Sequence, residues 1–197
     1  METVVHKERP YVAKGRDNWM KIDLIVIDVD GTLTDGAIFY GDNNTEIKAF
    51  SARDGLVLKT LPRLGISVIF LTWRDSEAVS RRAIDLGATA IQGVGDKLAV
   101  LKAILIERGV EPEYCAYIGD DLNDYAAMQI CGFRGCPADS VAEIREICDY
   151  VSPYGGGHGA VRDICDNILK RAGKYNAFLD VYKVTPLGIR CTSICQG

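Results

Sequence analysis

The chain has 197 residues, of which 48% are hydrophobic and 25% charged, and its formal net charge is −4. This length suits one globular domain with a single core. The acidic balance and the lack of a basic stripe argue against a nucleic-acid partner, and no apolar run approaches the roughly 20 residues of a membrane span. Residues 1–20 carry scattered charges without an apolar core, so we expect a loosely ordered arm there and a cytoplasmic protein.

The first expected strand ends in two acids. Apolar residues from Leu24 to Ile27 are followed by Asp28, Asp30 and Gly31. Residues two apart on a strand share a face, so the two carboxylates can converge, and they would then need a cation such as Mg²⁺. A polar turn that merely closes a strand would explain two acids alone, but the full string DVDGTLTDG is far rarer.

A hairpin and repeated strand–helix units follow this strand. Turn residues at 41–44 between apolar flanks predict a β-hairpin over 37–50. Strand patterns recur at 66–72, 88–93 and 113–121, and helical patterns at 54–65 (interrupted by Pro62), 74–87, 96–109, 121–132, 139–148 and after a glycine-rich loop at 155–159.

This alternation predicts an α/β fold, a doubly wound, Rossmann-like parallel sheet with helices on both faces. Only the hairpin and one helix separate the first acids from the second long strand, so no large cap domain is expected. We expect a single domain over 21–175 and a carboxyl-terminal tail over 176–197. The seven cysteines are expected to be reduced, since several lie in apolar segments, and Cys191 and Cys195 lack the further ligands of a zinc site.

Polar residues recur at the predicted strand ends. Thr72 follows the second long strand, Lys97 begins a helix, and three acids follow the 113–121 strand, namely Asp120, Asp121 and Asp124. Carboxyl ends of parallel strands are where open α/β sheets bind ligands. Thr72 alone could be a strand-end cap and Lys97 alone a solvated helix residue, but their joint order favours a site.

In this order the segments resemble the four motifs of the haloacid dehalogenase superfamily of phosphohydrolases. The resemblance implies that Asp28 is a nucleophile forming an aspartyl phosphate, and that Asp30 protonates the leaving alcohol and then activates water. It also implies that Thr72 and Lys97 bind phosphoryl oxygens. The implied Mg²⁺ ligands are Asp28, Asp30 (through its carbonyl) and Asp120, with Asp121 and Asp124 supporting them.

The hairpin, the missing cap and the segments KAFSARDG, GVGDK and YVSPYGGGHGAVRD resemble the 3-deoxy-D-manno-octulosonate 8-phosphate phosphatase family. That resemblance implies a phosphorylated sugar acid as substrate, a role in lipopolysaccharide biosynthesis, and a homotetramer in which one subunit's hairpin helps cover a neighbour's site. It also implies that Arg53 and Arg74 lie near the pocket, where an arginine could pair with the sugar carboxylate. A solvated rim is the alternative for both arginines.

Three other functions stay open at this stage. Relatives of the family act on 9-phosphates of sialic-type nine-carbon acids, and Trp73 stands where relatives commonly show glycine. A non-catalytic subunit of a nucleotide-sugar pathway enzyme would not require the intact acids. A receiver-like phosphoacceptor would not need a general acid two residues after its phosphorylated aspartate.

Overall fold

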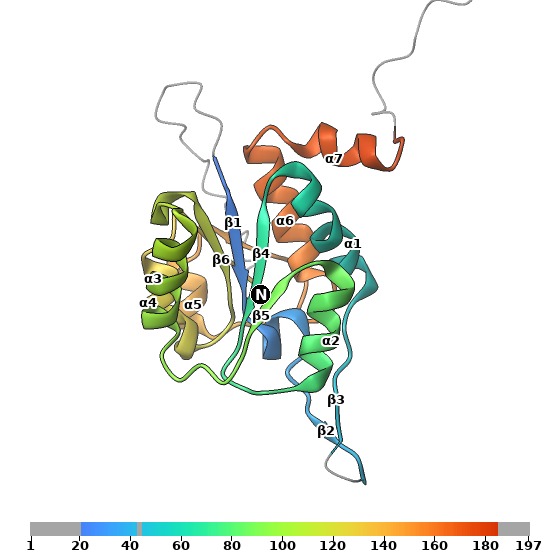
Figure 1. Ribbon diagram of the computed structural model, residues 1–197, viewed down its shortest axis with the longest axis vertical. Coiled ribbons are helices and arrows are strands. Elements are labelled where there is room, and N and C mark those ends of the chain that lie inside the picture. Colours follow the sequence, from blue (N-terminus) through green and yellow to red (C-terminus); the bar gives the residue numbers. More distant parts are fainter. Residues whose placement is uncertain (1–20, 43–44, 185–197) are drawn as a thin grey trace, which may run out of the picture.

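The computed structural model describes residues 21–42 and 45–184, which form a six-stranded parallel sheet between two layers of helices (Figure 1). The sheet order is β5-β4-β1-β6-β7-β8, so β1 lies at its centre, and this confirms the predicted α/β fold. The strands are β1 (Leu24–Ile27), β4 (Ser67–Leu71), β5 (Thr89–Ile91), β6 (Cys115–Ile118), β7 (Phe133–Cys136) and β8 (Tyr150–Val151).

Side chains on β1 alternate between two cores, which is why this strand is apolar throughout. Ile25 and Ile27 belong to one core, and Leu24 and Val26 belong to the other. The first core is covered by α1 (Ala52–Thr60), α2 (Glu77–Leu86) and α6 (Ala160–Arg171), and the second by α3 (Lys97–Arg108), α4 (Leu122–Gln129) and α5 (Ala142–Ile147).

Local signals in the sequence account for several helix ends. Pro62 ends the first helical pattern early: α1 gives way to a 3₁₀ turn over Leu61–Leu64. Gly87 closes α2 in the left-handed region with φ 69°. A second 3₁₀ turn, Pro112–Tyr114, leads directly into β6.

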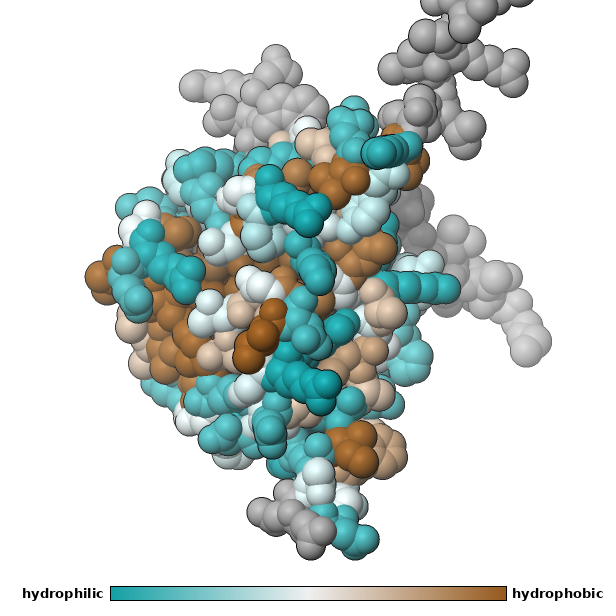
Figure 2. Space-filling view, turned by 45° about the vertical axis from the view of Figure 1, so that its right-hand side comes forward, coloured by the Kyte–Doolittle hydropathy of each residue, from teal (hydrophilic) through white to brown (hydrophobic). Residues whose placement is uncertain are grey.

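The predicted hairpin is present and stretches away from the body of the molecule (Figure 1). Its strands β2 (Phe39–Tyr40) and β3 (Glu46–Ile47) pair antiparallel. Phe39, Tyr40 and Ile47 are all more than half exposed, and Figure 2 shows brown, apolar surface near this end of the molecule. Between β1 and β4 the described residues hold nothing larger than this hairpin, α1 and the 3₁₀ turn, in agreement with the expected lack of a large cap.

Sequence reasoning missed β7 and β8. Both are short, and β7 contains Arg134 and Gly135, so neither shows an apolar run long enough to signal a strand. Only pairing with β6 and with each other makes them part of the sheet.

The first part of the expected tail packs on the domain. Helix α7 (Tyr175–Val181) runs across the division expected between residues 175 and 176, and its Phe178 is buried in the core beside α6. The hydroxyls of Tyr182 and Thr60 lie 2.6 Å apart, which ties this end of the chain to α1. Residues 1–20 and 185–197, including Cys191 and Cys195, lie outside the described residues. The five cysteines in the described part of the chain are free thiols.

None of the helices in the described part of the chain combines the length and the apolar character needed to cross a membrane.

Candidate active site

The carboxyl ends of the central strands bring the sequence-predicted residues together. Ile27 pairs with Phe70 of β4 and with Ile118 of β6, so the three strands end level with one another. Asp28 and Thr72, which follow β1 and β4, are both at least 95% buried. Parallel strands therefore place the predicted residues at one edge of the sheet, as expected.

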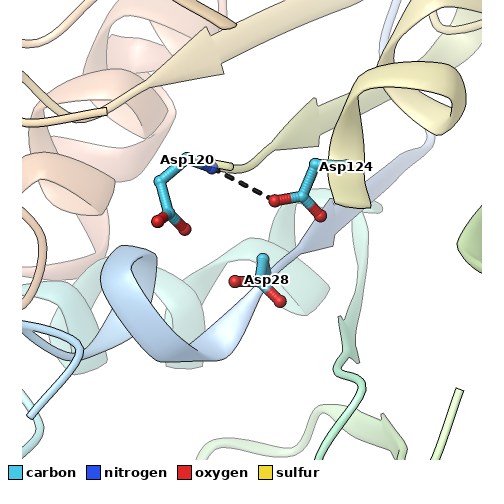
Figure 3. A group of neighbouring side chains, drawn as sticks. All are labelled: Asp28, Asp120 and Asp124. Carbon is cyan, nitrogen blue, oxygen red and sulfur yellow. Dashed lines mark hydrogen bonds between the residues drawn. The ribbon is translucent and has the colours of Figure 1, made fainter. Parts of the chain in front are cut away.

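Three acids form a tight cluster at this edge. Carboxylate oxygens of Asp28, Asp120 and Asp124 lie within 4.8 Å of one another, and Figure 3 shows Asp120 and Asp124 approaching Asp28 from the loop after β6 and from α4. Burial, with the nearby charge of Asp124, raises the pKa of Asp28 well above its usual range. Burial also raises the pKa of Asp120 to about 6. Such a cluster of oxygen donors would be stabilised by a bound divalent cation.

The turn after β1 positions Asp120. Gly31 has φ 94°, and a Cβ atom at this position would lie 2.1 Å from Oδ2 of Asp120. The next residue, Thr32, donates a hydrogen bond of 2.7 Å from Oγ1 to Oδ1 of Asp120. The Gly-Thr pair thus leaves room for the carboxylate and then holds it.

The glycine-rich loop before α6 packs against the backbone of that turn. A Cβ on Gly156 would lie 1.9 Å from the carbonyl oxygen of Gly31, and the N–H of Gly157 donates to the carbonyl of Thr32 at 3.1 Å. The loop is therefore a close crossing of two backbone segments. Within it, Nδ1 of His158 lies 2.7 Å from the carbonyl oxygen of Gly156.

Lys97 joins two acids of the cluster. It opens α3, and its Nζ donates to Oδ1 of Asp28 at 2.5 Å and to Oδ1 of Asp124 at 2.7 Å. Burial alone would lower the pKa of Lys97, but the charges of Asp28 and Asp124 raise it. The ammonium group is thus held in its charged form beside Asp28.

Asp124 is saturated by protein donors. Besides Lys97, the hydroxyl of Tyr117 donates to its Oδ1 at 2.8 Å, and the N–H of Asp120 donates to its Oδ2 at 3.2 Å, the bond drawn in Figure 3. Burial raises the pKa of Tyr117, which keeps the hydroxyl protonated as a donor. Asp121 caps α4 and accepts from the N–H of Leu122 at 2.7 Å.

Asp30 lies against the base of the hairpin. Its Oδ1 accepts a hydrogen bond from Nζ of Lys48, and its Oδ2 is 4.0 Å from Nε of Arg74. Glu46 bridges the two cations, 3.2 Å from Lys48 and 2.7 Å from Arg74. Although Glu46 is partly desolvated, hydrogen bonds led by that of Arg74 lower its pKa to about 2.

Thr72 and Arg74 belong to one short turn. The N–H of Arg74 donates to Oγ1 of Thr72 at 3.3 Å, and the guanidinium also donates to the hydroxyl of Tyr40 at 3.1 Å. Trp73, between them, is 68% exposed. Arg74 therefore links the end of β4 to both strands of the hairpin.

Arg53 lies near the start of α1. It lines a cavity of about 270 Å³ together with Tyr154, His158 and Arg162, a set that contains none of the three clustered acids. Its neighbour Asp54 is buried and accepts a 2.7 Å hydrogen bond from the N–H of Arg162 at the start of α6. Arg74 is not among the residues that line this cavity.

Four residues of this network were not identified from the sequence, namely Thr32, Glu46, Lys48 and Tyr117. Thr32 lies inside the DVDGT string and Lys48 opens the KAFSARDG segment, so both had a signal in their position. Tyr117 reads as an ordinary core residue of a buried strand, and nothing in the sequence marks its hydroxyl.

No family model matches the chain. Comparison with individual proteins and solved structures does give matches, and they agree with one another. The 3-deoxy-D-manno-octulosonate 8-phosphate phosphatase KdsC of Escherichia coli K12 is 39% identical over 140 residues, which cover 71% of this chain and 74% of that protein. The solved structure of the phosphatase of the same name from Moraxella catarrhalis, in complex with magnesium, phosphate and KDO, is 42% identical with a TM-score of 0.79 and covers 82% of this chain and 94% of that one. The cobalt-bound enzyme from Haemophilus influenzae is 38% identical with a TM-score of 0.77, and the match covers 81% of this chain and 94% of that one.

Proposed function

This chain belongs to the 3-deoxy-D-manno-octulosonate 8-phosphate phosphatase family of haloacid dehalogenase-type phosphatases, and we propose that it hydrolyses 3-deoxy-D-manno-octulosonate 8-phosphate with Mg²⁺ as cofactor. The observation that carries the proposal is the buried cluster in which Lys97 bonds Asp28 and Asp124 while Asp120 stands beside them. The complex of the Moraxella catarrhalis enzyme supports it, since phosphate and the free sugar acid are the products of this hydrolysis.

The donor set fits Mg²⁺, a hard cation that prefers oxygen ligands. We assign its ligands as the carboxylates of Asp28 and Asp120 and the backbone carbonyl of Asp30. Asp124 is left out because its oxygens already accept bonds from Lys97, Tyr117 and the backbone. When bound, Mg²⁺ would offset the negative charge of the acids and of the phosphate, so that one anion can approach the other.

The protein groups then divide the reaction into two displacements. A carboxylate oxygen of Asp28 attacks phosphorus, the bond from phosphorus to the sugar oxygen breaks, and Asp30 gives its proton to that oxygen. In the second step Asp30 takes a proton from water, whose oxygen attacks the aspartyl phosphate, releasing phosphate and restoring Asp28. Lys97 and Thr72 bind the phosphoryl oxygens, and Asp121 and Asp124 hold the surrounding backbone and Lys97 in place.

Specificity for a sugar acid would come from cations beyond the phosphate. Arg74 is the first candidate to pair with the substrate carboxylate, because its guanidinium lies at the rim beside Asp30 and is one third exposed. Arg53, which lines the cavity beside α6, is the second candidate.

We further propose a homotetramer and a cytoplasmic location. The exposed apolar residues of the hairpin, Phe39, Tyr40 and Ile47, support burial of the hairpin against another subunit. The free cysteines among the described residues suit a reducing compartment.

The test is phosphate release, with and without Mg²⁺, from a panel of substrates. The panel contains 3-deoxy-D-manno-octulosonate 8-phosphate, sialic-type 9-phosphates and common hexose phosphates. We expect Mg²⁺-dependent hydrolysis with the highest kcat/KM for the first. A preference for a 9-phosphate would replace the substrate but keep the chemistry, and failure on every sugar phosphate would favour a non-catalytic subunit of a nucleotide-sugar pathway enzyme.

A further inference from the structure

The hairpin carries a buried cation that the two displacements do not use. Lys48 directly follows β3, and its side chain is 0% exposed. A buried ammonium group is unfavourable unless it is paired and hydrogen-bonded. Its partners are Oδ1 of Asp30 and Oε1 of Glu46. One of these two acids is the group that moves protons in the proposed reaction.

The contacts hold the carboxylate of Asp30 from two sides. Lys48 bonds one oxygen, Nε of Arg74 faces the other at 4.0 Å, and Glu46 joins the two cations. The Asp30 side chain is 19% exposed and directly precedes Gly31, where the chain turns, and its side-chain partners among the described residues are these two cations. A proton is transferred efficiently only when the acid lies within hydrogen-bond reach of the leaving oxygen.

We propose that Lys48 is a positioning residue, which orients the carboxyl group of Asp30 from the base of the hairpin so that Asp30 can protonate the leaving group. This inference rests on the proposed function, in which Asp30 is the general acid. It assigns to the hairpin a task inside its own subunit, in addition to covering a site. The contribution of Lys48 must then depend on how much the leaving group needs a proton.

Two substrates separate this role from a merely structural one. A sugar alkoxide leaves only with a proton, whereas p-nitrophenolate leaves readily without one. General acid–base catalysis typically contributes about 10²–10⁴-fold, so we expect Lys48→Met to lower kcat/KM for the best sugar phosphate by about 10–100-fold and for p-nitrophenyl phosphate by less than about threefold. The ratio kcat/KM is the measure because it reports only steps up to formation of the aspartyl phosphate.

A matched control is Lys21→Met. It breaks a lysine–aspartate pair of 2.7 Å with Asp23, ahead of β1 and therefore at the opposite end of that strand from Asp28. Lys21→Met should leave kcat/KM unchanged for both substrates. Lys48→Arg, which keeps a cation beside Asp30, should retain most of the wild-type value, and thermal unfolding of each variant checks that it is folded.

A double-mutant cycle decides whether Lys48 acts through Asp30. In an Asp30→Asn background, Lys48→Met should cause no further loss on the sugar phosphate. Equal losses on both substrates, or losses that multiply in the double variant, would overturn the inference while leaving the proposed function intact. A wild-type protein that releases phosphate from no sugar phosphate would instead overturn the proposed function, and this inference with it.

Discussion

Replacing Gly31 by alanine should raise the Mg²⁺ concentration that the enzyme requires. Gly31 has φ 94°, and the added methyl group would lie 2.1 Å from Oδ2 and 2.7 Å from Cγ of Asp120. Either the backbone turn or the carboxylate must move. The carboxylate is the softer of the two, since it is the end of a side chain, and it is one of the assigned metal ligands.

Two costs add up in this variant. A left-handed conformation costs a non-glycine residue about 1–2 kcal/mol. Moving the carboxylate breaks the 2.7 Å hydrogen bond from Thr32, and a hydrogen bond to a charged group contributes about 1.5–3 kcal/mol. If the free energy of the lost Thr32 hydrogen bond is subtracted from that of Mg²⁺ binding, Mg²⁺ affinity should drop by roughly 10–100-fold, since about 1.4 kcal/mol corresponds to a factor of ten.

The assay is phosphate release as a function of Mg²⁺ concentration, together with thermal unfolding. Gly65→Ala is the matched control, because Gly65 has φ 77° and, its own chain neighbours aside, no described atom lies within 4 Å of the position of its added Cβ. That variant should lose a similar amount of stability to backbone strain and keep the wild-type Mg²⁺ requirement. If Gly31→Ala also kept the wild-type requirement, the assignment of Asp120 as a metal ligand through this turn would be refuted.

Asp28→Asn should reduce kcat by roughly 10⁴-fold or more, as loss of a nucleophile does; retention of normal phosphate release would show that another group attacks phosphorus. Because burial raises the pKa of Asp120 to about 6, a proton must leave before a cation binds, so Mg²⁺ affinity measured by calorimetry should weaken about tenfold per pH unit below that value. An affinity that is the same at acidic and neutral pH would contradict this. Tyr117→Phe removes the 2.8 Å bond to Asp124 and should lower both kcat and, by about 1.5–3 kcal/mol, the free energy of unfolding. Tyr150→Phe, which loses a 2.8 Å bond to Asp163, should cost stability only, and equal kcat values for the two variants would argue against a role for the Tyr117 hydroxyl.

Local patterns predicted the frame of the protein correctly. Some signals act only on their immediate neighbours, so their effects can be predicted without the rest of the chain. They are the apolar run of β1, the turn residues of the hairpin, Pro62 and Gly87. The strands β7 and β8 could not be read in this way. Their few residues form strands only because β6 offers an edge to pair with.

The pairing of Lys48 with Asp30 shows the same limit within the site. The two residues are 18 positions apart, and a lysine after a hairpin reads as solvated until the hairpin's approach to the turn after β1 is known. Arg53 is a second example, since its place in the ARDG segment suggested a pocket residue, but that its cavity is shared with residues of α6 could not be read from the sequence.

By itself the sequence determined which acids stand at strand ends and in what order, because strand and turn formation are local and parallel strands end at a common edge. Only the tertiary structure decided which donors reach each acid. Asp120 and Asp124 are four residues apart and chemically identical, yet Lys97 and Tyr117 saturate Asp124 and leave Asp120 beside Asp28. That difference arises because α3 and β6 bring their donors to one carboxylate and not to the other, and such long-range packing is absent from any local pattern.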